Sequence, residues 1–289
     1  MYDLSSFVDK HPGGPKWLTM TRGQDVTDFF IIHHLNETKA RETLNKFYVG
    51  DTGKQVSRYS FEEGGLYRDI RKRVLQKFTP FEIQNESTTR KQAVLILVMF
   101  LAFLGLTTYL IGSEERTWWP YLTSAVSGIL MLGIVGVGHN FVHHKDNVFK
   151  YYYLLTGFSH DEWQVMHCLS HHIYPNLELD YEAAILEPIG YFLRSMPKNH
   201  ILTEPLVILV FTFYQPLNMI VKMVVSPILH KKRPDLLYVI PIFLVLGTYY
   251  LRTGDFWYSL KMHLVLYCIF GFFMNRMLFC GHRLQNLWT

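Results

Sequence analysis

The sequence predicts a small α+β domain at the N-terminus, followed by an all-α integral membrane domain with about four transmembrane helices. Three observations lead to this fold class. Residues 1–50 are polar and combine helical with extended patterns. Four later segments are apolar over a length close to that of a bilayer core. Apolar residues make up 49% of the chain while charged residues gather in short blocks, which is typical of a soluble part joined to a membrane part.

The N-terminal domain is predicted over residues 1–50, in which residues 36–50 form a polar helix that leads into a short strand. Residues 51–65 are polar and contain glycines, as expected of a linker. The first ten residues have no basic start followed by an apolar run, so they do not form a secretory signal. We therefore expect this domain to face the cytosol.

The membrane domain is predicted over residues 66–289 and begins with an amphipathic helix over residues 66–78. Arginines and lysines cover most of this helix, and its apolar residues fall along one face. These apolar residues are Leu66, Ile70, Val74, Leu75 and Phe78. A helix lying on a membrane surface fits this pattern, and a solvated helix that couples the two domains is the alternative.

Four apolar segments are predicted to span the bilayer, near residues 93–112, 119–138, 235–251 and 258–279. The first has twenty residues without a charge. At about 1.5 Å per residue, that length crosses a hydrocarbon core of about 30 Å. The second contains small residues, among them Gly128 and Gly133, that allow close contact between helices.

The charge pattern orients these segments. Basic runs at residues 68–73 and 230–233 adjoin apolar segments, so a cytosolic membrane surface explains them better than nucleic acid does. The net charge of +4 is also small. With a cytosolic N-terminus and four spans, the histidine clusters considered next all fall on the cytosolic face.

The stretch over residues 11–38 has the pattern of a haem-binding segment. His11 lies in the sequence HPGG, where proline and glycines form a tight turn that lets the ring approach a ligand. His33 and His34 follow 22 and 23 residues later, after a pair of phenylalanines. A six-coordinate haem needs two axial nitrogen ligands on opposite faces, which these histidines can supply. A loop histidine and a polar helix segment are the alternative.

Two further clusters share the pattern H-x-x-x-H-H: His139, His143 and His144 form the first, and His167, His171 and His172 form the second. On a helix, residues four apart share a face, so each cluster can present a pair of rings. Imidazole is a common ligand for transition metals, and no cysteine set supports a structural zinc site. Nearby acids are expected to orient the rings: Asp146, Asp161, Glu162 and Asp180.

These motifs carry a resemblance over nearly the whole chain. Residues 2–50, with HPGG and FIIHHL, resemble a cytochrome b5-type haem domain. The stretches HNFVHHKDN and LSHHIYPN resemble the histidine boxes of the membrane fatty acid desaturases and hydroxylases that hold a di-iron centre. The chain as a whole is similar to cytochrome b5-related proteins, in which a haem domain precedes a desaturase domain.

The resemblance implies specific ligands. Haem would be held by His11 and His34, with His33 as the alternative to His34. Iron would be held by the histidine boxes, namely His139, His143, His144, His167, His171 and His172, and by His282 as a single additional ligand. Compared with the family, the chain lacks the first strand of the haem domain and a third histidine box. We therefore expect it to be truncated at both ends.

The resemblance also implies a function. It implies a membrane fatty acyl desaturase that uses O2, with haem b, two non-haem iron ions and electrons from NADH delivered by NADH–cytochrome b5 reductase. The substrate would be a fatty acyl lipid, and the protein would lie in the endoplasmic reticulum membrane. Nucleic acid would not be a partner. Two alternatives stay open: a related fatty acyl hydroxylase, and a membrane-anchored haem electron carrier whose desaturase-like domain is not catalytic.

Overall fold

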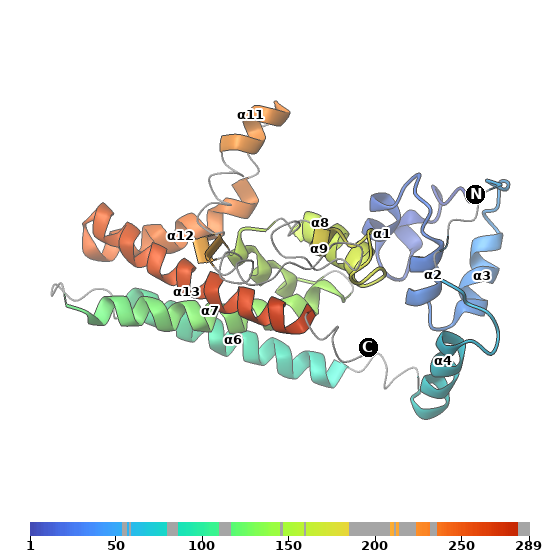
Figure 1. The fold of residues 1–289 in the computed structure, drawn as a ribbon, viewed down its shortest axis with the longest axis horizontal. Coiled ribbons are helices and arrows are strands. Elements are labelled where there is room, and N and C mark those ends of the chain that lie inside the picture. The colour runs from blue at the N-terminus through green and yellow to red at the C-terminus, as the bar shows by residue number, and fades with distance from the viewer. Residues whose placement is uncertain are drawn as a thin grey trace. The chain divides into compact units, whose positions relative to one another are not determined.

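The structure is a computed structural model, and it describes residues 1–53, 57, 59–79, 86–109, 117–144, 147–158, 160–184, 209–210, 212–213, 224–231 and 236–282. The chain divides into two units, Met1–Arg90 and Lys91–Thr289, and each is described by itself. Figure 1 traces the helices of both along the chain.

The N-terminal unit is built mainly from helices. In chain order they are the 3-10 helix η1 (Val8–Lys10), α1 (Pro15–Met20), α2 (Thr27–His33), α3 (Glu37–Asn45) and α4 (Leu66–Lys77). In the described part of this unit, Tyr2 and Tyr48 pair through an antiparallel β-bridge. Next to this bridge, Asp3 N donates a hydrogen bond to Phe47 O at 2.9 Å. The helix and short strand predicted over residues 36–50 are thus α3 and the chain around Tyr48.

Local sequence determines where α1 and α3 begin. Pro15 occupies the first position of α1, where its missing N–H costs nothing and its fixed φ suits a helix. Asn36 caps α3, and its side-chain oxygen accepts a hydrogen bond from Lys39 N at 3.1 Å. Glu37 follows in the first turn, where the helix dipole favours a carboxylate.

In the described residues that follow, four helices are long and several are short. The long helices are α6 (Glu86–Tyr109), α7 (Trp119–Val142), α12 (Leu236–Thr253) and α13 (Phe256–His282). The short ones are the 3-10 helix η3 (Phe149–Thr156), α8 (His160–Trp163), the π-helix η4 (Gln164–His171), α9 (Tyr181–Ala184) and α11 (Ser226–His230).

Among the described residues, three helical segments are long and apolar enough to cross a membrane: Thr89–Thr108, Trp119–Val142 and Phe256–Met274. They overlap three of the predicted spans. The remaining predicted span, residues 235–251, overlaps α12, whose described apolar segment, Val239–Thr253, is shorter. The chain is that of a membrane protein.

Helices α7 and α13 lie side by side in the membrane unit (Figure 1). A Cβ atom on Gly128 would lie 2.5 Å from the carbonyl oxygen of Leu266, so only glycine allows this approach. The close contact predicted from small residues is therefore confirmed at Gly128. The Tyr267 hydroxyl donates to Leu155 O at 3.2 Å, which ties α13 to η3, the helix that leads toward the second histidine cluster.

Helix α4 is the predicted amphipathic helix, but one of its arginines is buried, whereas the sequence predicts all of its charged residues on the exposed part of the helix. Leu66 is 77% exposed and Ile70 is 51% exposed, as on a surface helix. Arg71, in contrast, is buried, because it binds the end of α2. Part of the predicted linker also contacts this unit, since the Ser57 hydroxyl bonds to Asp28.

Candidate haem and metal sites

The HPGG turn fixes the ring of His11. Its Nδ1 lies 2.9 Å from the carbonyl oxygen of Gly14, so Nδ1 carries the proton and Nε2 keeps a lone pair for a metal. A Cβ atom on Gly13 would lie 2.9 Å from Cε1 of His11, which glycine avoids. Gly14 has a φ of +97°, in the region that favours glycine. Both glycines therefore serve the placement of this ring.

His34 is held in the same way at the end of α2. Its Nδ1 lies 2.8 Å from Phe30 O, and its ring packs on that of Phe30 at 4.4 Å between centroids. The rings of His11 and His34 lie close together in an edge-on arrangement, with centroids 6.2 Å apart and an angle of 66° between the ring planes. Two imidazoles that both keep Nε2 free are the donor set for the axial positions of a haem.

His33, the alternative ligand, lies on another side of α2. It is exposed, its Nδ1 bonds to Phe29 O at 3.0 Å, and its ring covers that of Phe29 at 3.9 Å. The ring facing His11 is that of His34. The geometry therefore favours His34 over His33.

The second candidate site joins α7 and η4. Nε2 of His139 lies 3.0 Å from Nε2 of His143 and 2.8 Å from Nε2 of His167. Nε2 of His172 lies 2.9 Å from that of His167. The candidate ligand atoms of all four residues lie within 4.8 Å of one another. Four imidazole nitrogens that converge on one point form a donor set for a divalent transition metal such as iron or zinc.

The π-helix η4 brings a third histidine close to the predicted pair. The α-helical spacing predicts that His167 and His171 share a face, and in addition His172 N donates to His167 O at 2.9 Å. A turn that closes over five residues stacks residue i on residue i+5. His172 therefore joins His167 in the converging group. The ring of His171 also stays next to that of His167, with centroids 5.5 Å apart, and its Nδ1 bonds to Asp180.

Carboxylates from α9 and the residue before it hold two of these rings. Nδ1 of His171 lies 2.9 Å from Asp180 Oδ2, and Nδ1 of His167 lies 2.5 Å from Glu182 Oε2. His167, His171 and Glu182 also form a second group of possible metal ligands. Asp180 was among the acids expected to orient rings. Glu182 was not, because no sequence spacing relates it to a histidine fifteen residues earlier.

Burial sets the protonation states around the site. Burial, and then the neighbouring histidines, lower the pKa of His143 to about 3, which keeps this ring neutral as metal binding requires. Burial alone would lower the pKa of His171, but its bond to Asp180 and the charges of Glu182 and Asp180 raise it above its ordinary value. Burial raises the pKa of the Cys168 thiol to about 12.

The remaining predicted residues lie apart from this group or outside the described side chains. His144 is exposed, and its ring packs on Phe141 at 5.9 Å rather than joining the converging nitrogens. His282 ends α13, but its side chain lies outside the described part of the chain, as does Asp146. His263 is a buried histidine on α13 that no sequence motif had identified.

Comparison with known proteins assigns both parts of the chain. The cytochrome b5-like haem/steroid-binding domain matches residues 1–53, and the fatty acid desaturase family matches residues 116–287. The chain belongs to the fatty acid desaturase family. It is 33% identical to a cytochrome b5-related protein of Drosophila melanogaster over 202 residues, which are 70% of this chain and 44% of that protein.

Other relatives match one or both parts. An acyl-lipid (8-3)-desaturase of Mortierella alpina is 26% identical over 204 residues, 65% of this chain and 45% of that protein. Cytochrome b5 of Saccharomyces cerevisiae is 29% identical over 113 residues, 39% of this chain and 78% of that protein. The chain spans roughly half the length of the first curated relatives that it matches. No solved structure matches it.

Proposed function

We propose that this chain is part of a membrane fatty acyl desaturase in which a haem-bearing unit supplies electrons to an iron site in the membrane unit. The observation that carries the proposal is the presence of two donor sets in one chain. Two imidazoles lie close together in the N-terminal unit, and four imidazole nitrogens converge in the membrane unit. The match to the desaturase family supports this reaction class.

The N-terminal unit fits haem b through its donor chemistry. His11 and His34 each bind a backbone carbonyl through Nδ1 and keep Nε2 for an axial position. Gly13 leaves the space that the His11 ring occupies. The cytochrome b5 resemblance points to NADH–cytochrome b5 reductase as the electron donor.

The membrane unit fits non-haem iron, with His139, His143, His167 and His172 as the first ligands and His171 and His282 as further ones. Two iron ions bound there would supply the activation of O2 that removal of hydrogen from an unactivated C–H bond requires. The chain itself orients the rings through Glu182 and Asp180. Trp163 stacks on the His167 ring at 4.7 Å and covers it from water.

The substrate of the proposed reaction is a fatty acyl lipid taken from the bilayer. The (8-3)-desaturase named above acts on acyl lipids according to its name, which supports this class. We place the protein in the endoplasmic reticulum membrane, with both sites on the cytosolic side. The covalent connection between the two units would keep the haem near its acceptor at an effective concentration on the order of mM.

Counting iron in the purified chain tests the proposal. Total iron and haem are measured in one detergent-solubilised sample of the whole chain. About three irons per haem are expected for one haem and a di-iron centre. About one iron per haem would contradict the iron site and favour the haem electron carrier. An iron-loaded sample without haem would contradict the role of the N-terminal unit.

The products of a lipid incubation separate the desaturase from the related hydroxylase. An acyl chain with two hydrogens fewer and one new double bond is expected. An acyl chain that has gained one oxygen atom would show hydroxylation instead.

A further inference from the structure

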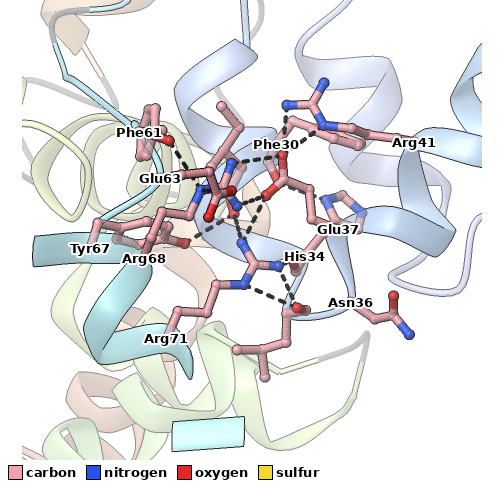
Figure 2. Close-up of polar contacts among 12 residues, drawn as sticks. Phe30, His34, Asn36, Glu37, Arg41, Phe61, Glu63, Tyr67, Arg68 and Arg71 are labelled. Carbon is pink, nitrogen blue, oxygen red and sulfur yellow. Dashed lines mark hydrogen bonds and ion pairs between the residues drawn. The ribbon is translucent and has the colours of Figure 1, made fainter. Parts of the chain in front are cut away.

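A helix outside the matched haem region binds the chain segment that carries His34. The haem-domain match ends at residue 53, whereas α4 begins at Leu66. Both belong to the N-terminal unit. Figure 2 shows Arg68 and Arg71 of α4 pointing toward Glu37 and toward the backbone at His34.

Arg71 donates hydrogen bonds to backbone carbonyls at the end of α2 and just after it. Its Nε donates to Leu35 O at 3.1 Å, and its Nη1 donates to Ile31 O at 3.3 Å. Its Nη2 donates to the carbonyl of His34 itself and to that of Leu35. Arg71 is only 9% exposed, so these bonds are shielded from water.

These contacts provide hydrogen-bond donors for backbone carbonyls at the end of α2. The last carbonyls of a helix have no partner within the helix, and the negative end of the helix dipole favours a cation there. α2 ends at His33, one residue before the proposed ligand. A guanidinium can satisfy several carbonyls at once because its donors form a rigid planar fork, which lysine lacks. Tyr67 supports the same end, since its hydroxyl donates to Ile31 O at 3.1 Å.

Glu37 fixes the other side of this segment. It is buried at the start of α3 and binds Arg71 at 3.1 Å, Arg41 at 2.6 Å and also Arg68. The three residues between His33 and Glu37 are therefore held between the end of α2 and the start of α3. Three guanidinium groups on one carboxylate also leave a local excess of positive charge.

We propose that Arg71 is a positioning residue for His34: it holds the backbone from which the second haem ligand projects, and its charge favours the reduced haem. This inference rests on the proposed haem site. It makes α4 part of the haem unit in function. A positive charge near a haem stabilises the form with one electron more, because that form carries one positive charge fewer.

The test compares variants of the whole chain in detergent. Arg71→Met removes the fork and the charge, Arg71→Lys keeps the charge alone, and Arg73→Met is the matched control. Arg73 lies on the same helix, is 75% exposed and pairs with Asp69. The readouts are the low-spin haem spectrum, the rate of haem transfer to apomyoglobin and the midpoint potential.

We expect Arg71→Met to release haem about tenfold faster or more, as when a group that orients a metal ligand is lost, and to shift the potential to a more negative value. Arg71→Lys is expected to restore the potential but not the rate of haem release. Arg73→Met is expected to behave as the unchanged chain. This split would not arise from a merely structural role, which would change haem release and leave the potential of the bound haem unmoved.

The outcomes separate this inference from the proposed function. If the unchanged chain binds no low-spin haem, the haem site itself is wrong. If it does, and both Arg71 variants keep its haem release and potential, the inference is overturned. If Arg71→Met does not fold, Arg71→Lys decides: haem release equal to that of the unchanged chain overturns the inference, and faster release at a preserved potential supports it.

Discussion

The two histidine sites place their rings by different means. In the N-terminal unit, His11 and His34 each bond through Nδ1 to a backbone carbonyl three or four residues away in sequence. In the membrane unit, the rings of His167 and His171 bond to carboxylates fifteen and nine residues away, and His167 also contacts His139 of α7. The first site is held by local backbone and the second by long-range side-chain contacts.

The difference follows from what each cofactor brings. A haem supplies four ligands to its own iron, so the protein adds two rings and needs only to aim them. Non-haem iron receives its nitrogen ligands from the protein, so several rings must converge and each must be oriented. We therefore expect changes in the membrane cluster to affect metal content and changes near His34 to affect haem state.

The largest effect is expected from His167→Ala. This ring contacts both His139 and His172 and belongs to both groups of possible ligands. Its loss should remove the non-haem iron while leaving the haem content unchanged, measured as total iron and haem in the same sample. His144→Ala is the contrasting variant, because the exposed His144 ring lies apart from the group. Equal loss of iron in both variants would show that the described geometry does not identify the ligands.

The next effect separates the two candidate haem ligands. His34→Ala should abolish the six-coordinate low-spin spectrum, because the ring that faces His11 is lost. His33→Ala should keep that spectrum, since its ring lies on Phe29. Absorption and electron paramagnetic resonance spectra of both variants provide the measurement. The reverse result would assign the second axial position to His33.

A smaller effect is expected from the carboxylate that orients His167. Glu182→Gln should weaken iron binding by about 10- to 100-fold, the range typical of groups that hold a metal ligand. Competition with a chelator measures this change. Glu178→Gln, at an exposed residue of the loop before α9, is the matched control. Equal iron retention in the two variants would leave Glu182 without the orienting role.

The smallest effect concerns the acid stability of the N-terminal unit. Burial alone would raise the pKa of Glu37, but hydrogen bonds and charges of Arg68 and Arg41 outweigh it and hold the pKa below its ordinary 4.5. A carboxylate with a lowered folded-state pKa adds stability that is complete above its unfolded pKa. That stability is lost as the pH falls through the folded-state value.

Glu37→Gln should therefore cost about 2 kcal/mol of unfolding free energy at pH 7, and the difference from the unchanged chain should shrink below the ordinary pKa of the carboxyl. Thermal unfolding, followed at the haem absorption band, measures the difference in stability at pH 7 and at a pH below the ordinary pKa of the carboxyl. Glu42→Gln, exposed on the same helix, is the control. A difference that stays constant with pH would mean that the Glu37 charge does not contribute.

The amino-acid sequence by itself determined the two-part architecture, three of the apolar spans and the histidines that can serve as ligands. These features depend on composition and on short spacings, such as HPGG and the paired clusters, which local geometry converts directly into position. The spacing of His139 and His143 at the end of α7 is of this kind, and their Nε2 atoms lie 3.0 Å apart.

Only the tertiary structure decided which candidates meet. His172 joins His139, His143 and His167 because η4 is a π-helix, and a turn of five residues cannot be read from a pattern that fits an α-helix equally well. Glu182 and Arg71 reach their partners across 15 and 37 residues of chain. No local spacing encodes such contacts, since they exist only after separate helices have packed together.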